Sequence, residues 1–404
     1  MTRPSIPRAE YGDRRRRARE LAAAAGFDAL LVWSMGGSTL DRYQNVFYLT
    51  NHYDPGNVFP DAENLFQGFG MAALVLPVDG SEVLVVNQPD WRQDLVDCAD
   101  VRVRRMLYDG VAEVLAEFGL ADALVGLTDE ERLPVAAFRA ITSTLPGLTL
   151  ARADDLLMGM RVVKSPAEIE MMRFASSVSV EIMSAMMETV AVGRTDGDLA
   201  AAGFEVASRY GAQPYDFALA SGPEDGHLWW SRLPSWNSGR EYKAGDIVHP
   251  DIYGVVDGYF YDFVRSTVVG GQPTDAQLEL LEAGIGAIHA ACARAIVGAR
   301  GKDVYNAVRE HLREVGLDHA DSAEPGAVSL STDVLEAAGH GIGLGWERPF
   351  FTPFEEMELV AGMTVAIEQH VARPGVGTIR YEETVLVTDD GPEIMTSASP
   401  SRWW

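Results

Sequence analysis

Five side chains in the second half of the sequence are of types that bind metal ions together. They are Asp251, Asp262, His340, Glu368 and Glu382. Carboxylates that converge on one spot repel one another unless cations lie between them. Oxygen ligands with a single nitrogen suit Mn²⁺, Fe²⁺, Co²⁺ or Zn²⁺, whereas a structural zinc site favours sulfur and nitrogen. The residue types therefore predict an oxygen-rich site for two divalent metal ions.

The two aspartates and the two glutamates form pairs, and we expect each pair to meet across a β-hairpin. Residues equally far from the centre of an antiparallel hairpin lie opposite each other on one face. The midpoint of the aspartates falls between Val256 and Asp257, beside an Asp-Gly turn signal, and the midpoint of the glutamates is Gly375. Like charges in opposition destabilise a hairpin, so these pairs again indicate cations. Arg380, two residues before Glu382, is placed to neutralise part of the cluster.

Length and composition favour a cytoplasmic enzyme of two globular domains. The chain has 404 residues, of which 47% are hydrophobic and 23% charged, enough for two cores. Its net charge of −26 argues against nucleic acid and against anionic membranes as partners. Cys98 and Cys292 lie far apart, as free thiols do in a reducing compartment. We expect no membrane span, and no signal peptide because no apolar run follows the arginines at 14–17.

The first 150 residues alternate helical and strand patterns, which predicts an α/β domain. We expect helices at 12–25 and 111–118, and strands at 29–33, 45–50, 71–77, 82–86 and 123–127. A long aromatic loop at 51–61 interrupts them. Loops of this length are often functional, and a plain surface loop fits the sequence equally well.

In the rest of the chain, long helices alternate with the strands that carry the acidic pairs. We expect these helices at 166–190, 198–210, 275–297 and 302–315. Alternation of this kind predicts a second domain that contains both helices and strands.

The metal-binding segments resemble the motifs of the creatinase/aminopeptidase P family, whose catalytic domain has the pita-bread fold. The likeness lies in the runs Met160 to Glu170, Gly245 to Gly270, Gly339 to Leu344, Gly362 to Glu368 and Arg380 to Thr388. The resemblance implies an α/β (α+β) homodimer with a creatinase-type N-terminal domain at 1–156 and a pita-bread catalytic domain at 157–404. It also implies that Asp251 chelates one ion, and that Asp262 and Glu382 bridge the two ions.

The chain departs from the family at two positions where its peptidases carry further histidines. The first such histidine follows the metal-binding histidine by about seven residues, and here Trp346 or Glu347 stands in its place. The second follows a serine-glycine motif. Here the next histidine after Ser221-Gly222 is His227, which a structural role would explain equally well. The family's proton donor and substrate ligand is therefore replaced or missing.

Several residues are candidates to take over these roles. His370 reaches the face of Glu368 if its strand alternates regularly. The tryptophans after His227 could hold a cationic head group by cation–π contact, although core packing would also explain them. We predict catalytic roles for His227, Glu347 and His370, and substrate contacts for Trp229, Trp230, Trp346 and Arg348.

The resemblance leaves three functions open. The first is hydrolysis of the amide C–N bond of an Xaa-Pro dipeptide by metal-bound hydroxide, while a carboxylate shuttles the proton. The second is a reaction on a small zwitterionic non-peptide, because the same fold hydrolyses creatine or ectoine or splits dimethylsulfoniopropionate. In the lyase, Glu347 or the hydroxide would remove a proton next to a carboxylate. The third is a non-catalytic binding protein. The intact ligand set favours an enzyme, and the missing histidine weakens the first function against the second.

Overall fold

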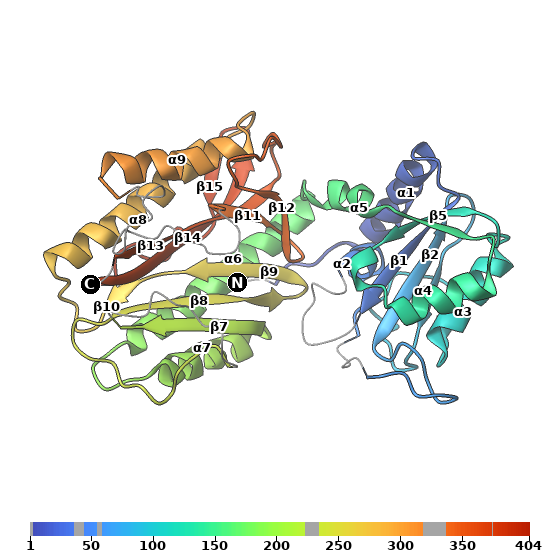
Figure 1. The fold of residues 1–404 in the computed structure, drawn as a ribbon, viewed down its shortest axis with the longest axis horizontal. Helices are drawn as coiled ribbons and strands as arrows, with labels where there is room; N and C mark the ends of the chain where they lie inside the picture. The colour runs from blue at the N-terminus through green and yellow to red at the C-terminus, as the bar shows by residue number, and fades with distance from the viewer. Residues whose placement is uncertain (1–2, 36–43, 55–58, 223–233, 318–336, 374) are drawn as a thin grey trace. The chain divides into compact units, whose positions relative to one another are not determined.

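The structure is a computed structural model that describes residues 3–35, 44–54, 59–222, 234–317, 337–373 and 375–404. The chain divides into two compact units, Ser5–Arg161 and Val162–Trp404 (Figure 1). Arg3 and Pro4 belong to the second unit, where the guanidinium group of Arg3 pairs with Asp257. The mixed α/β class expected from the sequence is confirmed.

The border between the units lies slightly later in the chain than the expected border at 156/157. Helix α5 (Asp154–Arg161) spans that position, so a border there would cut the helix. Arg161 ties the helix to the first unit, because its guanidinium donates hydrogen bonds to the side chains of Asn45 and Gln44, at 2.9 and 3.0 Å. The border therefore falls directly after this arginine.

The first unit is built on one six-stranded sheet in the order β4-β3-β2-β1-β5-β6. Its strands are β1 (Ala29–Met35), β2 (Met71–Pro77), β3 (Val83–Val86), β4 (Val101–Val103), β5 (Leu124–Thr128) and β6 (Thr149–Arg152). Its further helices are α1 (Arg8–Ala24), α2 (Gln44–Thr50), α3 (Leu107–Glu117), α4 (Val135–Thr144) and the short η2 (Glu130–Arg132). Apolar residues of the sheet and of α3 and α4 form its core.

The strand expected at 45–50 is wrong, because this segment is the helix α2. A short apolar run has no period that separates a buried strand from a buried helix. Contacts with α1 stabilise the helical conformation of this segment. Arg14 and Arg15 of α1 donate hydrogen bonds to the backbone carbonyls of Tyr48 and Leu49, at 3.0 and 2.7 Å, and so satisfy the last turn.

The second unit contains two sheets whose strands carry the predicted metal ligands. In the first, β8 (Ile247–Val256) pairs with β7 (Gln213–Ser221), β9 (Tyr259–Val264) and β10 (Thr267–Val268). The second has the order β12-β11-β13-β14-β15. Its strands are β11 (Gly339–Ile342), β12 (Trp346–Phe350), β13 (Thr364–Arg373), β14 (Gly377–Thr388) and β15 (Gly391–Ile394). Strand β14 contacts both β8 and β9, so the two sheets meet along these strands.

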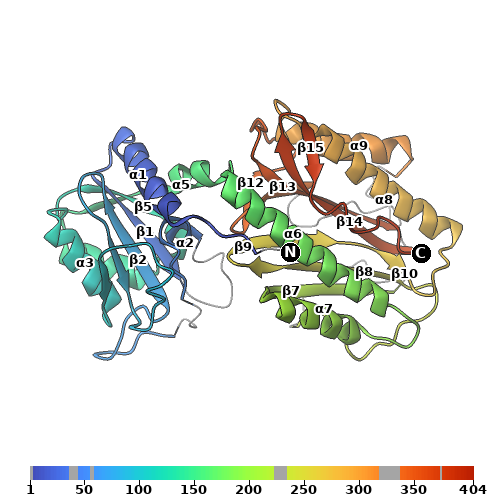
Figure 2. The ribbon, with the colours of Figure 1, turned by 180° about the vertical axis from the view of Figure 1, so that it is seen from behind.

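Four long helices lie on the outer side of these sheets, and the fourth of them packs on the third (Figure 2). They are α6 (Pro166–Thr189), α7 (Asp196–Tyr210), α8 (Asp275–Arg294) and α9 (Gly301–Glu314). Helices α6 and α7 pack on β7, β8 and β9, whereas α8 packs on β13 and β14. Three of the helices begin at a capping box, with Ser165, Thr195 and Thr274 as the N-caps. The four helices expected from the sequence are thus present, within two or three residues of the expected ends.

Within the described ranges, the helices are all too short or too polar to cross a lipid bilayer.

Candidate metal centre

The two aspartates stand on the same face of one hairpin, but they are not directly opposite. Strands β8 and β9 pair up to the two-residue turn Asp257-Gly258, in which both residues have positive φ, of 50° and 88°. The register places Asp251 opposite Val264 and Asp262 opposite Tyr253. The expected direct opposition is therefore wrong, because the turn centre lies one residue later than predicted. A shift of two residues in the register keeps both carboxylates on one face, as diagonal neighbours.

The two glutamates do lie directly opposite each other, as expected. Glu368 of β13 pairs with Glu382 of β14, and the register runs without a bulge from the first to the last residue of β13. The neighbouring strand β11 pairs His340 with Ala366, two residues from Glu368 and on the same face. One sheet therefore presents both glutamates and the histidine together.

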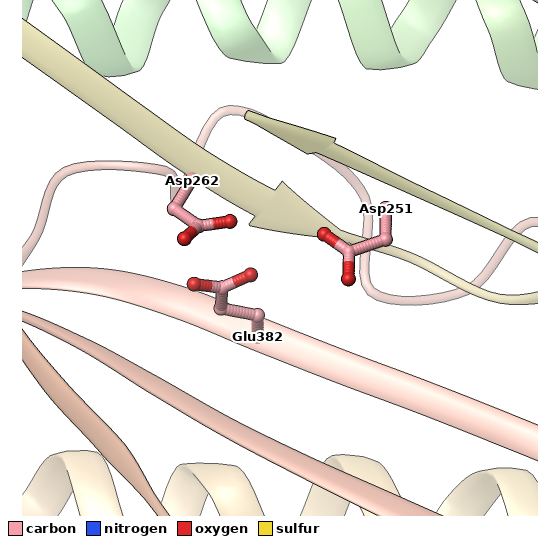
Figure 3. A group of neighbouring side chains, drawn as sticks. All are labelled: Asp251, Asp262 and Glu382. Atoms are coloured by element: carbon pink, nitrogen blue, oxygen red, sulfur yellow. The ribbon is translucent and has the colours of Figure 1, made fainter. Parts of the chain in front are cut away.

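The contact between the two sheets brings the five side chains to one place. Asp251, Asp262 and Glu382 have carboxylate oxygens that all lie within 4.8 Å of one another, and their side chains point toward a common centre (Figure 3). His340 completes the group, since its Nε2 lies 3.6 Å from Oδ2 of Asp262 and 3.9 Å from Oε1 of Glu368.

The imidazole of His340 is oriented for metal binding. Its Nδ1 lies 3.0 Å from the carbonyl oxygen of Gly341, so Nδ1 carries the proton and donates a hydrogen bond to that oxygen. The lone pair of Nε2 then faces the carboxylates. Burial lowers the pKa of His340, which keeps the ring neutral. Gly339 allows β11 to lie close to β13, because a Cβ at this position would lie 2.1 Å from the carbonyl oxygen of Ala366.

Arg380 neutralises part of the acidic group, as the sequence predicts. Its guanidinium donates hydrogen bonds to Oδ2 of Asp251 and, at 2.8 Å, to Oε2 of Glu368. Burial alone would lower the pKa of Arg380, but the charges of the four carboxylates raise it above its ordinary value. One positive charge nevertheless faces four acidic groups.

Ionisation of these carboxylates is unfavourable in the absence of a cation, despite the charge of Arg380. Burial, followed by the other acidic side chains, raises the pKa of Asp251 and of Asp262 to about 8 each. The same causes raise the pKa of Glu382 well above its usual range. Neither carboxylate oxygen of Glu382 accepts a hydrogen bond from any residue that the structure describes. Buried polar atoms without partners are rare and costly, so this donor set fits divalent cations.

Two family models match the sequence, and together they cover most of it. The model described as "Metallopeptidase family M24" matches residues 170–389, which is more than half of the chain, and that of the "Creatinase/Prolidase N-terminal domain" matches residues 14–163. The chain belongs to metallopeptidase family M24. The predicted membership of the creatinase/aminopeptidase P group is thereby confirmed.

Relatives of this M24 protein include two dipeptidases. The chain is 28% identical to the Xaa-Pro dipeptidase of Pyrococcus furiosus over 61% of its own length and 66% of that relative, just under two thirds. It is 29% identical to the probable dipeptidase PepE of Mycobacterium tuberculosis, over 80% of the chain and 82% of the relative. The prolidase structure from Pyrococcus horikoshii superposes with a TM-score of 0.77 at 20% identity, covering 95% of this chain and 98% of that one. The last comparison shows the shared fold.

Strand β12 of the M24 protein follows β11, the strand of His340, and carries three of the predicted catalytic and substrate residues. Trp346 donates a hydrogen bond from its indole Nε1 to Oδ2 of Asp262, at 2.7 Å. Glu347 is instead buried in an ion pair with Lys164 Nζ, at 2.9 Å, with side chains only 1% and 2% exposed. Arg348 pairs with Glu355 at 3.2 Å. Of the three, only Trp346 is thus bound directly to a carboxylate of the metal centre.

The other candidate residues are divided between a described and an undescribed part of the chain. His370 lies two residues after Glu368 in a regular register, opposite Arg380, so it shares the face of the metal ligands as the alternation requires. It is buried. His227, Trp229 and Trp230 lie outside the described residues.

Three residues in or near the centre had no role assigned to them by the sequence pattern. Tyr253 stands opposite Asp262, and the two-residue alternation after Asp251 was the signal that could have revealed it. Lys164 reaches β12 from far upstream. Arg265 is fully buried and donates a hydrogen bond to Glu383, next to the predicted ligand Glu382, at 2.8 Å. No local pattern reveals contacts of the last two kinds.

Proposed function

We propose that this M24 protein is a hydrolase that uses two divalent metal ions to cleave the amide C–N bond of Xaa-Pro dipeptides. The observation that carries the proposal is the buried carboxylate of Glu382, which has no hydrogen-bond partner among the described residues and faces Asp251 and Asp262. The substrate class is supported by the names of the dipeptidase relatives. Manganese, iron, cobalt and zinc all suit the ligands.

The five side chains would divide between two ions. Asp251 would hold one ion together with Asp262 and Glu382. His340 and Glu368 would hold the other ion, and the carboxylates of Asp262 and Glu382 would be shared by both. Bound divalent ions would lower the pKa of a water molecule and polarise the carbonyl oxygen of the substrate. Arg380 holds the carboxylates of Asp251 and Glu368 in position for them.

Glu368 is the acidic ligand best placed to move a proton. Its side chain is 19% exposed, compared with 8% for Asp251 and 9% for Asp262. Arg380 occupies its Oε2. We assign to the carboxylate of Glu368 the acceptance of a proton from the attacking water and its delivery to the leaving nitrogen. A C–O bond forms, the C–N bond breaks, and the nitrogen leaves as an amine.

A small zwitterionic non-peptide is the second candidate substrate, and one observation favours it. The indole N–H of Trp346 is committed to Asp262, and Glu347 to Lys164. In the described part of the chain, the strand after the metal histidine therefore offers no imidazole that could donate a proton to an amide nitrogen. A substrate whose leaving group needs no such donor would suit this centre.

The test compares the wild-type protein with Asp262→Asn and Asp257→Asn. The control changes an aspartate of the same hairpin at its turn, where asparagine tolerates a positive φ. Metal content is measured on each protein after reconstitution with Mn²⁺ or Zn²⁺, and cleavage is measured on a panel of Xaa-Pro dipeptides. We expect about two ions per chain and proline-dependent cleavage in wild type and control, and loss of both in Asp262→Asn with the fold retained.

Other outcomes separate the alternatives. Full metal retention in Asp262→Asn would refute the ligand assignment. Two ions without any dipeptide cleavage would support the non-peptide substrate, and the assay would move to small zwitterions. Absence of metal from the wild-type protein would favour the binding protein. The homodimer and the cytoplasmic location stay predictions, the first of which sedimentation equilibrium would test.

A further inference from the structure

The indole of Trp346 is held in place from several sides, although this residue is 46% exposed. Its ring packs against Tyr253, with centroids 5.6 Å apart at 49°, and edge-on against Phe260, at 5.4 Å and 65°. The ring of His340 lies 6.3 Å away, at 80°. The indole N–H points inward, to Oδ2 of Asp262 at 2.7 Å. A tryptophan this exposed could satisfy its N–H with water, but here a buried carboxylate accepts it.

The backbone brings this indole to the metal ligands. Trp346 begins β12 and pairs with Ile342 of β11, two residues after His340. The connection between these strands is short, and Gly345 takes a φ of 155° directly before the tryptophan. Tyr253, in turn, stands opposite Asp262 in the β8–β9 hairpin. The indole therefore connects the strand pair that carries the histidine to the hairpin that carries the aspartates.

The hydrogen bond acts on an oxygen that metal binding needs. Oδ2 of Asp262 accepts the indole N–H and is also the oxygen that lies 3.6 Å from Nε2 of His340. Hydrogen bonds to ionised acceptors are shorter and stronger than those between neutral groups, so this one restricts rotation of the carboxylate. Groups that hold a metal ligand in orientation typically change metal affinity when they are removed.

We propose that Trp346 is a positioning residue of the metal centre: its indole N–H fixes the Asp262 carboxylate, and Tyr253 and Phe260 fix the indole. The inference rests on the proposed metal centre. It assigns the N–H and the ring of Trp346 to different tasks, since the N–H orients a ligand and the ring packs. Substitutions that remove one without the other can separate them.

The experiment measures Mn²⁺ binding to the full chain by titration calorimetry after a chelator has removed the metal. Trp346→Phe removes the N–H donor and keeps an aromatic ring. Trp236→Phe is the matched control, because Trp236 belongs to the same unit and packs on Phe204. We expect Trp346→Phe to bind Mn²⁺ about 10- to 100-fold more weakly than wild type, with an unchanged melting temperature of the metal-free protein, and Trp236→Phe to bind as wild type does.

Tyr253→Leu is a second variant, which keeps the N–H and removes one support of the ring. We expect it to weaken Mn²⁺ binding in the same direction but less, and this result supports the proposal even if Trp346→Phe does not fold. Wild-type affinity in folded Trp346→Phe overturns the proposal, as does wild-type affinity in Tyr253→Leu if Trp346→Phe does not fold. These outcomes leave the metal centre standing, whereas failure of the wild-type protein to bind Mn²⁺ refutes the centre itself.

A spectroscopic measurement distinguishes positioning from packing. In protein labelled with 5-fluorotryptophan, the ¹⁹F resonance that disappears in Trp346→Phe belongs to Trp346. We expect this resonance to shift when Zn²⁺ is added, because the carboxylate that accepts its N–H becomes a ligand. The resonance that disappears in Trp236→Phe should not move. A Trp346 resonance whose chemical shift does not change when Zn²⁺ is added would leave the indole with a packing role only and overturn the proposal.

Discussion

Glu382 shows most clearly how single residues shape this protein. Its carboxylate is buried against Asp251 and Asp262, and its oxygens accept no hydrogen bond within the described residues. A group of this kind destabilises the metal-free fold, because the energetic cost of removing its charge from water is not recovered. The residue that makes the cation site is thus also a source of instability when the cation is absent.

The metal-free protein should lose stability as the pH rises. The pKa of Asp251 and of Asp262 is raised to about 8 in the folded state, from an ordinary value of 3.8. Between these values the folded state binds more protons than the unfolded state, so their contribution to stability is complete below the lower value and is lost as pH passes through the higher. We expect the melting temperature of the metal-free protein to fall from about pH 5 to about pH 9.

Two comparisons check the origin of this slope by calorimetry. Glu382→Gln removes one of the repelling charges, so its melting temperature should depend less steeply on pH. Addition of Mn²⁺ should stabilise the wild-type protein most at high pH, where the carboxylates are ionised. A slope that is equal in wild type and Glu382→Gln would show that the carboxylate cluster does not cause it.

The sequence predicts which carboxylates lie together, because hairpin symmetry is a local property. Residues equally spaced about a turn must share a face, and this holds for Glu368 and Glu382 and, after a shift in register, for Asp251 and Asp262. The bond from Trp346 to Asp262 joins segments 84 residues apart. Its existence depends on how two sheets meet, and no spacing in the sequence encodes it.

At the scale of elements, the segment before α6 is tied to the strands of the metal centre by a buried ion pair. Lys164 is the third residue after the unit border, and Glu347 stands on β12 beside Trp346. Their sequence separation of 183 residues explains why Glu347 was predicted to be catalytic. From the sequence alone, an acidic residue next to a motif has no visible partner. In the structure, the partner of Glu347 is Lys164.

Loss of one partner of this pair should cost much more than loss of both. Lys164→Met removes the buried positive charge that pairs with the carboxylate of Glu347, and we expect it to lower the free energy of unfolding by about 3–5 kcal/mol. The double variant Lys164→Met/Glu347→Leu removes both charges and should recover most of this loss. Urea denaturation measures all three proteins. A double variant as unstable as Lys164→Met would mean that packing around Lys164, rather than its charge, is responsible.

The helices also differ in whether local signals in the sequence or tertiary contacts determine them. Long helices with capping boxes, such as those after Ser165 and Thr274, were predictable because their start signals are local. The helix α2 was not. Its last turn is satisfied by arginines of α1, so its conformation depends on a tertiary contact.

At the scale of the whole molecule, all five predicted ligands belong to the unit Val162–Trp404. The first unit has its own sheet and its own core. The metal centre should therefore form without it. We expect a protein that begins at Val162 to bind Mn²⁺ with the stoichiometry of the full chain. Metal analysis after size-exclusion chromatography checks this, and a folded fragment without metal would show that the first unit contributes to the site.

The carboxylate of Glu382, which accepts no hydrogen bond from the described residues, has a consequence for the lifetime of the protein in a cell. A newly made chain that meets no cation folds around mutually repelling groups, and a larger fraction of such molecules is unfolded at any moment. Proteases remove unfolded chains, and small changes in folding free energy alter abundance several-fold. We therefore expect turnover to accelerate when divalent metals are scarce, so that the amount of this protein follows the metal supply.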